Sequence, residues 1–202
     1  MNDCIETMME EHELIVRVLA SLREMAGQLR DGTAGSRRDA ADFARFFREF
    51  ADRCHHGKEE DQLFREMVAS GFPQESGPIA VMLSEHDAGR REVGALRRIG
   101  DGNGPLTDAD RDELIASAEA FVPLLNLHIH KENNILYPMA RTAIPGRKLA
   151  ELNESCARFD QEVMGPDEVA GLHALAEDLI RRYPADPEVL AVPGACGGCG
   201  GH

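Results

Sequence analysis

Tryptophan is absent from the 202-residue sequence, and aromatic residues make up only 5% of it. No apolar run approaches the ~18 residues that a membrane span requires. The N-terminal stretch MNDCIETMMEEHELI is acidic, and it lacks the basic start and apolar block of a signal peptide. We therefore expect a cytoplasmic protein that has no membrane as a partner.

Positive charge is also scarce, because 22 lysines and arginines stand against 36 aspartates and glutamates. The formal net charge of -14 argues against nucleic acid and anionic membranes as main partners, since like charges repel. This charge does not oppose the binding of metal cations.

Cysteines are few and odd in number. Cys4, Cys54 and Cys156 are scattered, while Cys196 and Cys199 lie close together near the end of the sequence. The odd count and the expected cytoplasmic location argue against a disulfide framework. The final GACGGCGGH has one CxxC without a second, so a flexible reactive tail is favoured over a zinc site.

Strand-like alternation is almost missing as well. Apolar residues recur at helical spacing between Gly- and Pro-rich breaks, which predicts helices at 3–29, 38–69, 77–99, 107–141, 146–163 and 167–183. The first four are long and have short connections. They predict an all-α, up-down-up-down four-helix bundle over residues 1–142. Two additional C-terminal helices over 143–183 would pack on the bundle, and residues 184–202 would form a flexible Pro/Gly/Cys tail.

Three of the predicted bundle helices carry a histidine where their apolar stripe calls for an apolar side chain. These histidines are His12, His86 and His128. On the helix predicted at 38–69, the apolar stripe runs beside His55 and places it at the edge of the buried face. All four long helices therefore offer a candidate metal ligand to the bundle interior.

Two of these helices also contain the pattern His-x-x-x-Glu, as His55 with Glu59 and His128 with Glu132. Residues four apart lie on one face of a helix, so such a pair can reach one metal ion, or its carboxylate can bridge two. A single pair is more often a surface feature, and a single histidine is more often a core residue. The conjunction on four helices favours a metal site, and imidazole with carboxylate suits iron, manganese or zinc.

In these stretches the sequence resembles the hemerythrin-like family, also called the HHE cation-binding domain. The resemblance covers about residues 3–141 and rests on EEHELI, CHHGKEEDQLF, EHDAGR and LHIHKENNILYP. It implies a four-helix bundle with a non-haem di-iron centre of two iron ions, bridged by Glu59, Glu132 and an oxo or hydroxo group. The implied ligands are His12, His55, Glu59, His86, His128 and Glu132.

The sequence departs from the oxygen-carrying members at two places. They have a further histidine one turn after the first on the third helix, where this sequence has Arg90, and Met82 lies one turn before His86. Their last carboxylate is an aspartate five residues after its histidine, whereas Glu132 follows His128 by four. One coordination position is thus unassigned, and solvent, His56, Glu60 or a residue of the additional helices could fill it.

Several neighbouring residues receive less prominent roles. His56 and Glu60 form a second pair, rotated about 100° from the first on an α-helix, which favours the helix flank. Glu85 could orient the ring of His86 through its other nitrogen. Three further expectations are an exposed His130, a solvated Lys58 and a buried Cys54. Glu11, Lys131, Glu154, Asp160 and Glu162 are expected at or near the surface.

Two functions remain open from the sequence. The first is a di-iron protein that binds or senses dioxygen, nitric oxide or peroxide through an open coordination position; its redox partner is unknown. The alternative is an iron storage, donor or iron-sulfur repair factor. A structural zinc bundle is a third possibility. No separate acid-base or nucleophile set is visible, so peroxidase or nitric oxide reductase turnover is left undecided.

Overall fold

The computed structural model describes residues 3–33 and 35–190, and within these ranges it contains helices and no strand. The prediction of an all-α fold is confirmed. The helical segments, with η for π-helical or 3-10 segments, are α1 Cys4–Arg30, α2 Arg37–Phe46, η1 Phe47–His56, η2 Glu59–Leu63, α3 Phe64–Ala69, α4 Gly77–Gly100, α5 Asp108–Lys131, η3 Glu132–Leu136, α6 Tyr137–Ala143, α7 Gly146–Val163, α8 Pro166–Arg182 and η4 Pro187–Leu190.

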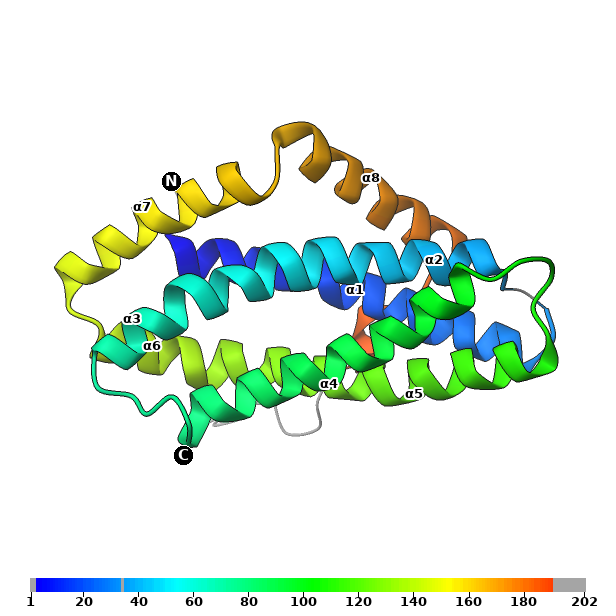
Figure 1. Ribbon diagram of the computed structural model, residues 1–202, viewed down its shortest axis with the longest axis horizontal. Helices are drawn as coiled ribbons and strands as arrows, with labels where there is room; N and C mark the ends of the chain where they lie inside the picture. Colours follow the sequence, from blue (N-terminus) through cyan, green and yellow to red (C-terminus); the bar gives the residue numbers. More distant parts are fainter. Residues whose placement is uncertain (1–2, 34, 191–202) are drawn as a thin grey trace, which may run out of the picture.

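Four long helical stretches lie along the length of the molecule, and successive ones run in alternating directions (Figure 1). They are α1, the continuous stretch from α2 to α3, α4, and the stretch from α5 to α6. Two of them begin with a capping box, formed by Asp3 with Glu6 and by Thr107 with Asp110. Such caps satisfy backbone N–H groups that the first helical turn leaves free, so the helix starts are well defined.

The apolar core has two parts with a polar layer between them. On α1, Ile5 and Met8 belong to one cluster, residues from Leu14 onward belong to the other, and buried His12 lies between. The stretch from α5 to α6 passes through the same layers in the reverse order, because Ile129 belongs to the cluster of Leu14 and Leu136 to that of Ile5, with buried Glu132 between them. A polar layer closed by apolar side chains on both sides is shielded from water.

The helices α7 and α8 lie over α1 and the stretch from α2 to α3, at the top of Figure 1. Helix α8 adds Leu172, Ala176 and Leu179 to the larger apolar cluster. Helix α7 contributes only Leu152 and Cys156 as buried residues. The molecule is thus covered on this side by one firmly packed helix and one lightly packed helix.

Cys4 and Cys156 form a disulfide, so the argument against disulfides from cysteine count and location is wrong for this pair. The reason is tertiary, because α7 folds back over the start of α1 and joins positions 152 residues apart. Cys54 is buried, as predicted, and its thiol is free.

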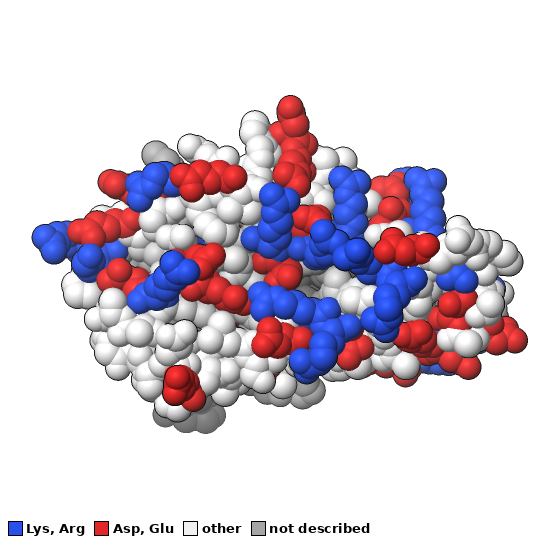
Figure 2. Space-filling view, viewed as in Figure 1, with Lys and Arg blue, Asp and Glu red and all other residues white. Residues whose placement is uncertain are grey.

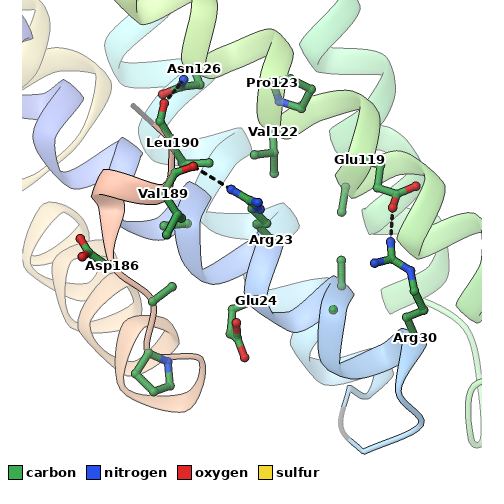
Figure 3. A pocket seen from close by; sticks show the side chains of 16 residues that line it. Arg23, Glu24, Arg30, Glu119, Val122, Pro123, Asn126, Asp186, Val189 and Leu190 are labelled. Atoms are coloured by element: carbon green, nitrogen blue, oxygen red, sulfur yellow. Dashed lines mark hydrogen bonds and ion pairs between the residues drawn. The ribbon is translucent and has the colours of Figure 1, made fainter. Parts of the chain in front are cut away.

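Residues 184–190, predicted as part of the flexible tail, pack against α1 and α5. Arg23 donates a hydrogen bond to the carbonyl of Val189 at 2.8 Å, and Asn126 donates one to the carbonyl of Leu190 at 2.6 Å (Figure 3). Residues 184–190 border a cavity of about 820 Å³, and none of the predicted metal ligands lines it. The remainder of the predicted tail, with Cys196 and Cys199, lies outside the described residues.

The surface carries both signs of charge. On the face drawn in Figure 2, lysines and arginines lie close to acidic side chains, and pairs such as Arg53 with Glu168 at 3.1 Å join neighbouring helices. Within residues 3–33 and 35–190, no helix combines the length and apolarity needed to cross a membrane.

Candidate metal centre

The polar layer contains every candidate ligand that the sequence favoured. They come from all four long stretches, and each side chain is buried: His12 on α1, His55 at the end of η1, Glu59 at the start of η2, His86 on α4, His128 on α5 and Glu132 at the start of η3. His56 is buried with them, whereas Glu60 is half-buried at the edge.

These side chains form two groups, each with ligand atoms within 4.8 Å of one another. One group is His12, His55, Glu59 and Glu132; the other is His56, Glu59, His86 and His128. Glu59 belongs to both groups. Its Oε2 lies 3.8 Å from His55 Nε2 in the first group and 3.4 Å from His86 Nε2 in the second. A carboxylate in this position can serve two metal ions.

Glu132 also reaches both groups. Its Oε2 lies 3.3 Å from His12 Nε2, and its Oε1 lies 3.0 Å from His128 Nε2. The two oxygens of one carboxylate therefore point to different clusters of imidazole nitrogens. The sequence-based expectation of two sharing carboxylates agrees with this arrangement.

Three π-helical segments shape the centre. The N–H of Gly57 bonds to the carbonyl of Asp52, that of Phe64 to Glu59, and that of Tyr137 to Glu132, each five residues back. A π-helical turn holds about one more residue than an α-helical turn, so successive side chains are rotated by less than 100°. This is why His55 and His56 both face inward, contrary to the rotation expected for an α-helix.

The central atoms fit a metal, because they lack other partners. His12 Nε2, His55 Nε2, Glu59 Oε2 and both oxygens of Glu132 are buried without a hydrogen bond. Leaving polar and charged atoms buried and unsatisfied costs several kcal/mol, and native proteins avoid it. Cations bound among these atoms would satisfy all of them, and nitrogen with carboxylate oxygen suits iron, manganese or zinc.

The outer nitrogen, Nδ1, of four histidines contacts a fixed oxygen. The pairs are His12 with Asn133 Oδ1 at 2.8 Å, His55 with Glu11 Oε2 at 2.7 Å, His86 with Glu60 Oε1 at 2.7 Å, and His128 with Glu85 Oε2 at 2.9 Å. Such partners fix the ring orientation and leave Nε2 for a metal. The expectation that Glu85 orients the neighbouring His86 is therefore wrong. Glu85 orients His128, and Glu60 orients His86.

Two of these outer carboxylates, Glu11 and Glu85, each pair with a lysine. Lys58 Nζ lies 2.6 Å from Glu11 Oε1 and 2.8 Å from Asp160 Oδ1, and its side chain is fully buried. The prediction of a solvated Lys58 is wrong, because α7 lies over it. Asp160 keeps its expected surface position, with 38% of its side chain exposed, and also pairs with Lys58. Lys131 similarly pairs with Glu85.

Arg90, at the position of the missing histidine, contacts two outer carboxylates. Its guanidinium lies 2.8 Å from Asp52 Oδ1 and 2.7 Å from Glu60 Oε1. Asp52 Oδ1 in turn lies 3.5 Å from His56 Nδ1. Arg90 thus supports the His86 imidazole through Glu60, and His56, whose Nδ1 has no hydrogen bond, supplies an additional imidazole inside the centre.

Tyr137 is a functional candidate that the sequence argument missed. It is buried, its hydroxyl donates a hydrogen bond to Glu59 Oε1 at 2.7 Å, and its ring stacks 5.7 Å from that of His12. Tyr137 directly precedes Pro138 in the sequence, which gives no sign of such a role, and α6 continues past both to Ala143. His130 is half-buried and lies outside both groups.

The pKa values of the histidines diverge in the metal-free centre. Burial lowers the pKa of His128, but the charge of nearby Glu132 and the contact with Glu85 outweigh burial and raise it to about 9. The pKa of His86 is also raised, because its contacts with three carboxylates outweigh burial. Burial, with the charge of His86, lowers the pKa of His56 to about 3.

We predict that metal-free protein loses stability as the pH rises from 6.5 to about 9. The pKa of His128 is 6.5 in the unfolded chain and about 9 in the folded protein, so the folded protein binds this proton more tightly. The resulting stabilisation is complete below pH 6.5 and is lost as the pH rises to about 9. Urea unfolding of chelated protein across this range measures the effect. A His128→Gln variant should show a flatter profile, and an equally steep profile in that variant would contradict the assignment.

Comparison with known proteins gives partial matches to proteins named for iron-sulfur cluster repair. The chain is 34% identical over 92 residues to the "Iron-sulfur cluster repair protein YtfE" of Musicola paradisiaca, which covers 44% of this chain and 41% of that protein. It is 33% identical over 92 residues to the "Probable iron-sulfur cluster repair protein" of Haemophilus influenzae, with the same coverage. The chain thus aligns with about two-fifths of the length of these relatives. No solved structure matches the chain.

A family model covers more of the chain than these relatives do. The model of the hemerythrin HHE cation binding domain matches residues 3–140, which include both His/Glu groups and end before α7. The resemblance expected from the four sequence stretches is confirmed, and the chain belongs to the hemerythrin HHE cation-binding domain family.

Proposed function

We propose that residues 3–142 form an up-down-up-down four-helix bundle of the hemerythrin type that holds two iron ions. The observation that carries this proposal is the pair of buried groups that share Glu59 and contain polar atoms without other partners. One ion would lie among His12, His55, Glu59 and Glu132, the other among His56, His86, His128 and Glu59. The predicted oxo or hydroxo bridge remains part of this proposal.

His56 takes the coordination position that the replacement of histidine by Arg90 leaves unassigned. Its ring stacks on that of His86 at 3.8 Å, and it is buried beside Glu59 and His128. Glu60, the other candidate for that position, is already committed to His86 Nδ1 and Arg90. The five histidines of the centre are then His12, His55, His56, His86 and His128.

The activity that we propose is iron supply, as in the repair of iron-sulfur clusters. The names of the partly matching relatives support it. The outer carboxylates that contact the histidines support the binding of the metal itself. Bound iron would supply a redox-active cation that can be given to an acceptor. The chain would orient the imidazoles through Glu11, Glu60 and Glu85, hold the Tyr137 proton against Glu59, and keep water out with its two apolar clusters.

Binding of a diatomic ligand is a second candidate, favoured by one cavity. A space of about 310 Å³ lies beside His56 and is lined largely by apolar side chains, including Phe47, Phe121 and Leu125. Gly89 borders it, and a Cβ there would come within 3.2 Å of the Phe121 ring. Small apolar molecules such as dioxygen or nitric oxide fit a space of this kind.

The test of iron supply uses ferrous protein under anaerobic conditions. We expect about two iron ions per chain by metal analysis, and transfer of iron to an acceptor protein stripped of its iron-sulfur cluster, followed by cluster absorbance with sulfide present. The control is the same total iron mixed with the Glu59→Gln variant. Equal cluster formation in both samples would contradict donation. A change in the iron absorption bands on addition of nitric oxide or azide, without transfer, would favour the second candidate.

A further inference from the structure

Helix α7 is tied to the start of α1, directly beside the candidate metal centre. Cys156 of α7 is bonded to Cys4, and the backbone N–H of Cys4 donates a hydrogen bond to Asn153 Oδ1 at 2.9 Å. Both anchoring residues of α7 are on the face that carries its two buried side chains, Leu152 and Cys156. The disulfide therefore fixes the lightly packed helix at the middle of its length.

A chain of contacts leads from this helix to a candidate ligand. One turn after Cys156, the Asp160 carboxylate lies 2.8 Å from Lys58 Nζ. Lys58 holds Glu11 at 2.6 Å, and Glu11 Oε2 lies 2.7 Å from His55 Nδ1. The orientation of the His55 ring thus depends on a carboxylate whose own partner is held partly by α7.

Helix α7 also closes over the backbone of the ligand segment. At Gly57, between His55 and Glu59, an added Cβ would lie 2.9 Å from the ring of Phe159. The absence of a side chain at this position is what lets α7 approach so closely. The buried state of Lys58 follows from this approach, because the aliphatic stem and ammonium group lie beneath α7.

The other contacts of α7 are few: Arg53 donates a hydrogen bond to the carbonyl of Val163 at 2.6 Å, and partly buried Leu149 and Val163 pack on the apolar clusters. Of its 18 residues, only two are buried, and its N-cap, Pro145, provides no side-chain hydrogen bond. Its basic and acidic residues pair mainly along the helix itself, as Lys148 does with Glu151 at 2.6 Å. A helix with so small a buried surface depends on its covalent link and on the Lys58 ion pair.

We propose that the Cys4–Cys156 disulfide is a redox latch, whose reduction frees α7 and speeds the release of metal from the His55 side of the centre. This proposal rests on the proposed iron supply, because it gives that supply a trigger. The reductant is a dithiol. Its two thiols are oxidised to a disulfide while the Cys4–Cys156 bond takes up two electrons and two protons and becomes two thiols.

The remaining cysteine in the described part of the chain does not compete in this exchange. Cys54 is buried, and its Sγ lies 3.8 Å from Asp160 Oδ1. A buried thiol has no access to an attacking dithiol or to the Cys4–Cys156 bond. Among the described cysteines, the bonded pair is therefore the one that can take part in exchange.

The latch is tested by metal release from ferrous protein, where the iron is already reduced. Under anaerobic conditions, iron loss to a chromogenic ferrous chelator is timed before and after reduction of the disulfide with a phosphine or dithiothreitol, with reduction verified by mass. We expect release to become at least about tenfold faster, as for loss of a group that orders a metal ligand. A Cys4→Ser/Cys156→Ser variant should release at the fast rate without reductant and show no further response.

Two single variants keep the test independent of the double variant's folding. Asp160→Asn, with the disulfide intact, should accelerate release, because Lys58 loses its α7 partner. Glu162→Gln changes an exposed carboxylate on the same helix and should release at the original rate. An unchanged rate in fully reduced protein, or equal rates for Asp160→Asn and Glu162→Gln, would overturn the latch.

Hydrogen exchange of metal-free protein separates the latch from the metal assignment. Reduction should raise amide exchange in residues 146–163 and around Lys58, and leave α8 unchanged. If the chain holds no iron but α7 still opens on reduction, the proposed iron supply fails and the latch stands. If iron is held and transferred but α7 exchange does not respond to reduction, the latch fails and the proposed function stands.

Discussion

Replacing Glu59 with glutamine is expected to remove both metal ions, the largest effect of any single change in the centre. Glu59 belongs to both His/Glu groups, so its charge is lost from each at once. An amide oxygen still accepts the hydrogen bond from Tyr137, which preserves the packing. We expect metal affinity to fall by more than about 100-fold, since even outer partners of metal ligands are worth 10–100-fold.

The measurement is metal content after anaerobic loading and gel filtration, with circular dichroism to show that the helices remain. His130→Ala is the matched control, because His130 lies two residues from His128 and outside both groups. It should keep the metal content of the original chain. Two ions per chain in the Glu59→Gln protein would refute the shared-carboxylate assignment.

Replacing Lys58 with methionine is expected to destabilise the protein strongly, although Lys58 lies outside the polar layer. The change leaves Glu11 and Asp160 without the buried ammonium group that lies between them. We expect a loss of about 3 kcal/mol in the free energy of unfolding, at the lower end for a broken buried ion pair, because Asp160 is 38% exposed and can regain water. Metal affinity should also fall, since Glu11 loses the partner that holds it against His55.

Lys131→Met is the matched control for this prediction. Lys131 pairs with Glu85, which contacts His128 as Glu11 contacts His55, but the Lys131 side chain is 25% exposed. A pair in contact with water contributes under about 1 kcal/mol, so this variant should unfold close to the original denaturant midpoint. Urea unfolding of both metal-free variants decides the matter; equal losses would show that the burial of Lys58 carries no special weight.

The two effects test different levels of the structure. Glu59 could be recognised as a candidate ligand from the sequence, because it follows His55 by four residues and so lies on the same helix face. Lys58, between them, has no such signal. Its burial depends on a helix that begins almost ninety residues later in the chain, at Gly146.

The sequence by itself determined the all-helical class and the main candidate ligands. Helical periodicity is local, so each stripe could be followed from residue to residue, and a histidine at an apolar position was visible wherever it occurred. This sufficed for His12, His86 and His128, and the two His-x-x-x-Glu pairs added His55, Glu59 and Glu132. The family resemblance rested on the same stretches and was confirmed.

Only the tertiary structure decided how these residues share their surroundings. His56 points inward because of π-helical turns. The contacts of Glu60 with His86 and of Glu85 with His128 depend on how neighbouring helices are rotated. Cys4 meets Cys156 because α7 folds back over α1. Periodicity within one helix carries no information on the rotation of its neighbour. The sequence therefore determines which residues share a buried face of each helix, while the packing of the helices determines which residues of different helices make contact.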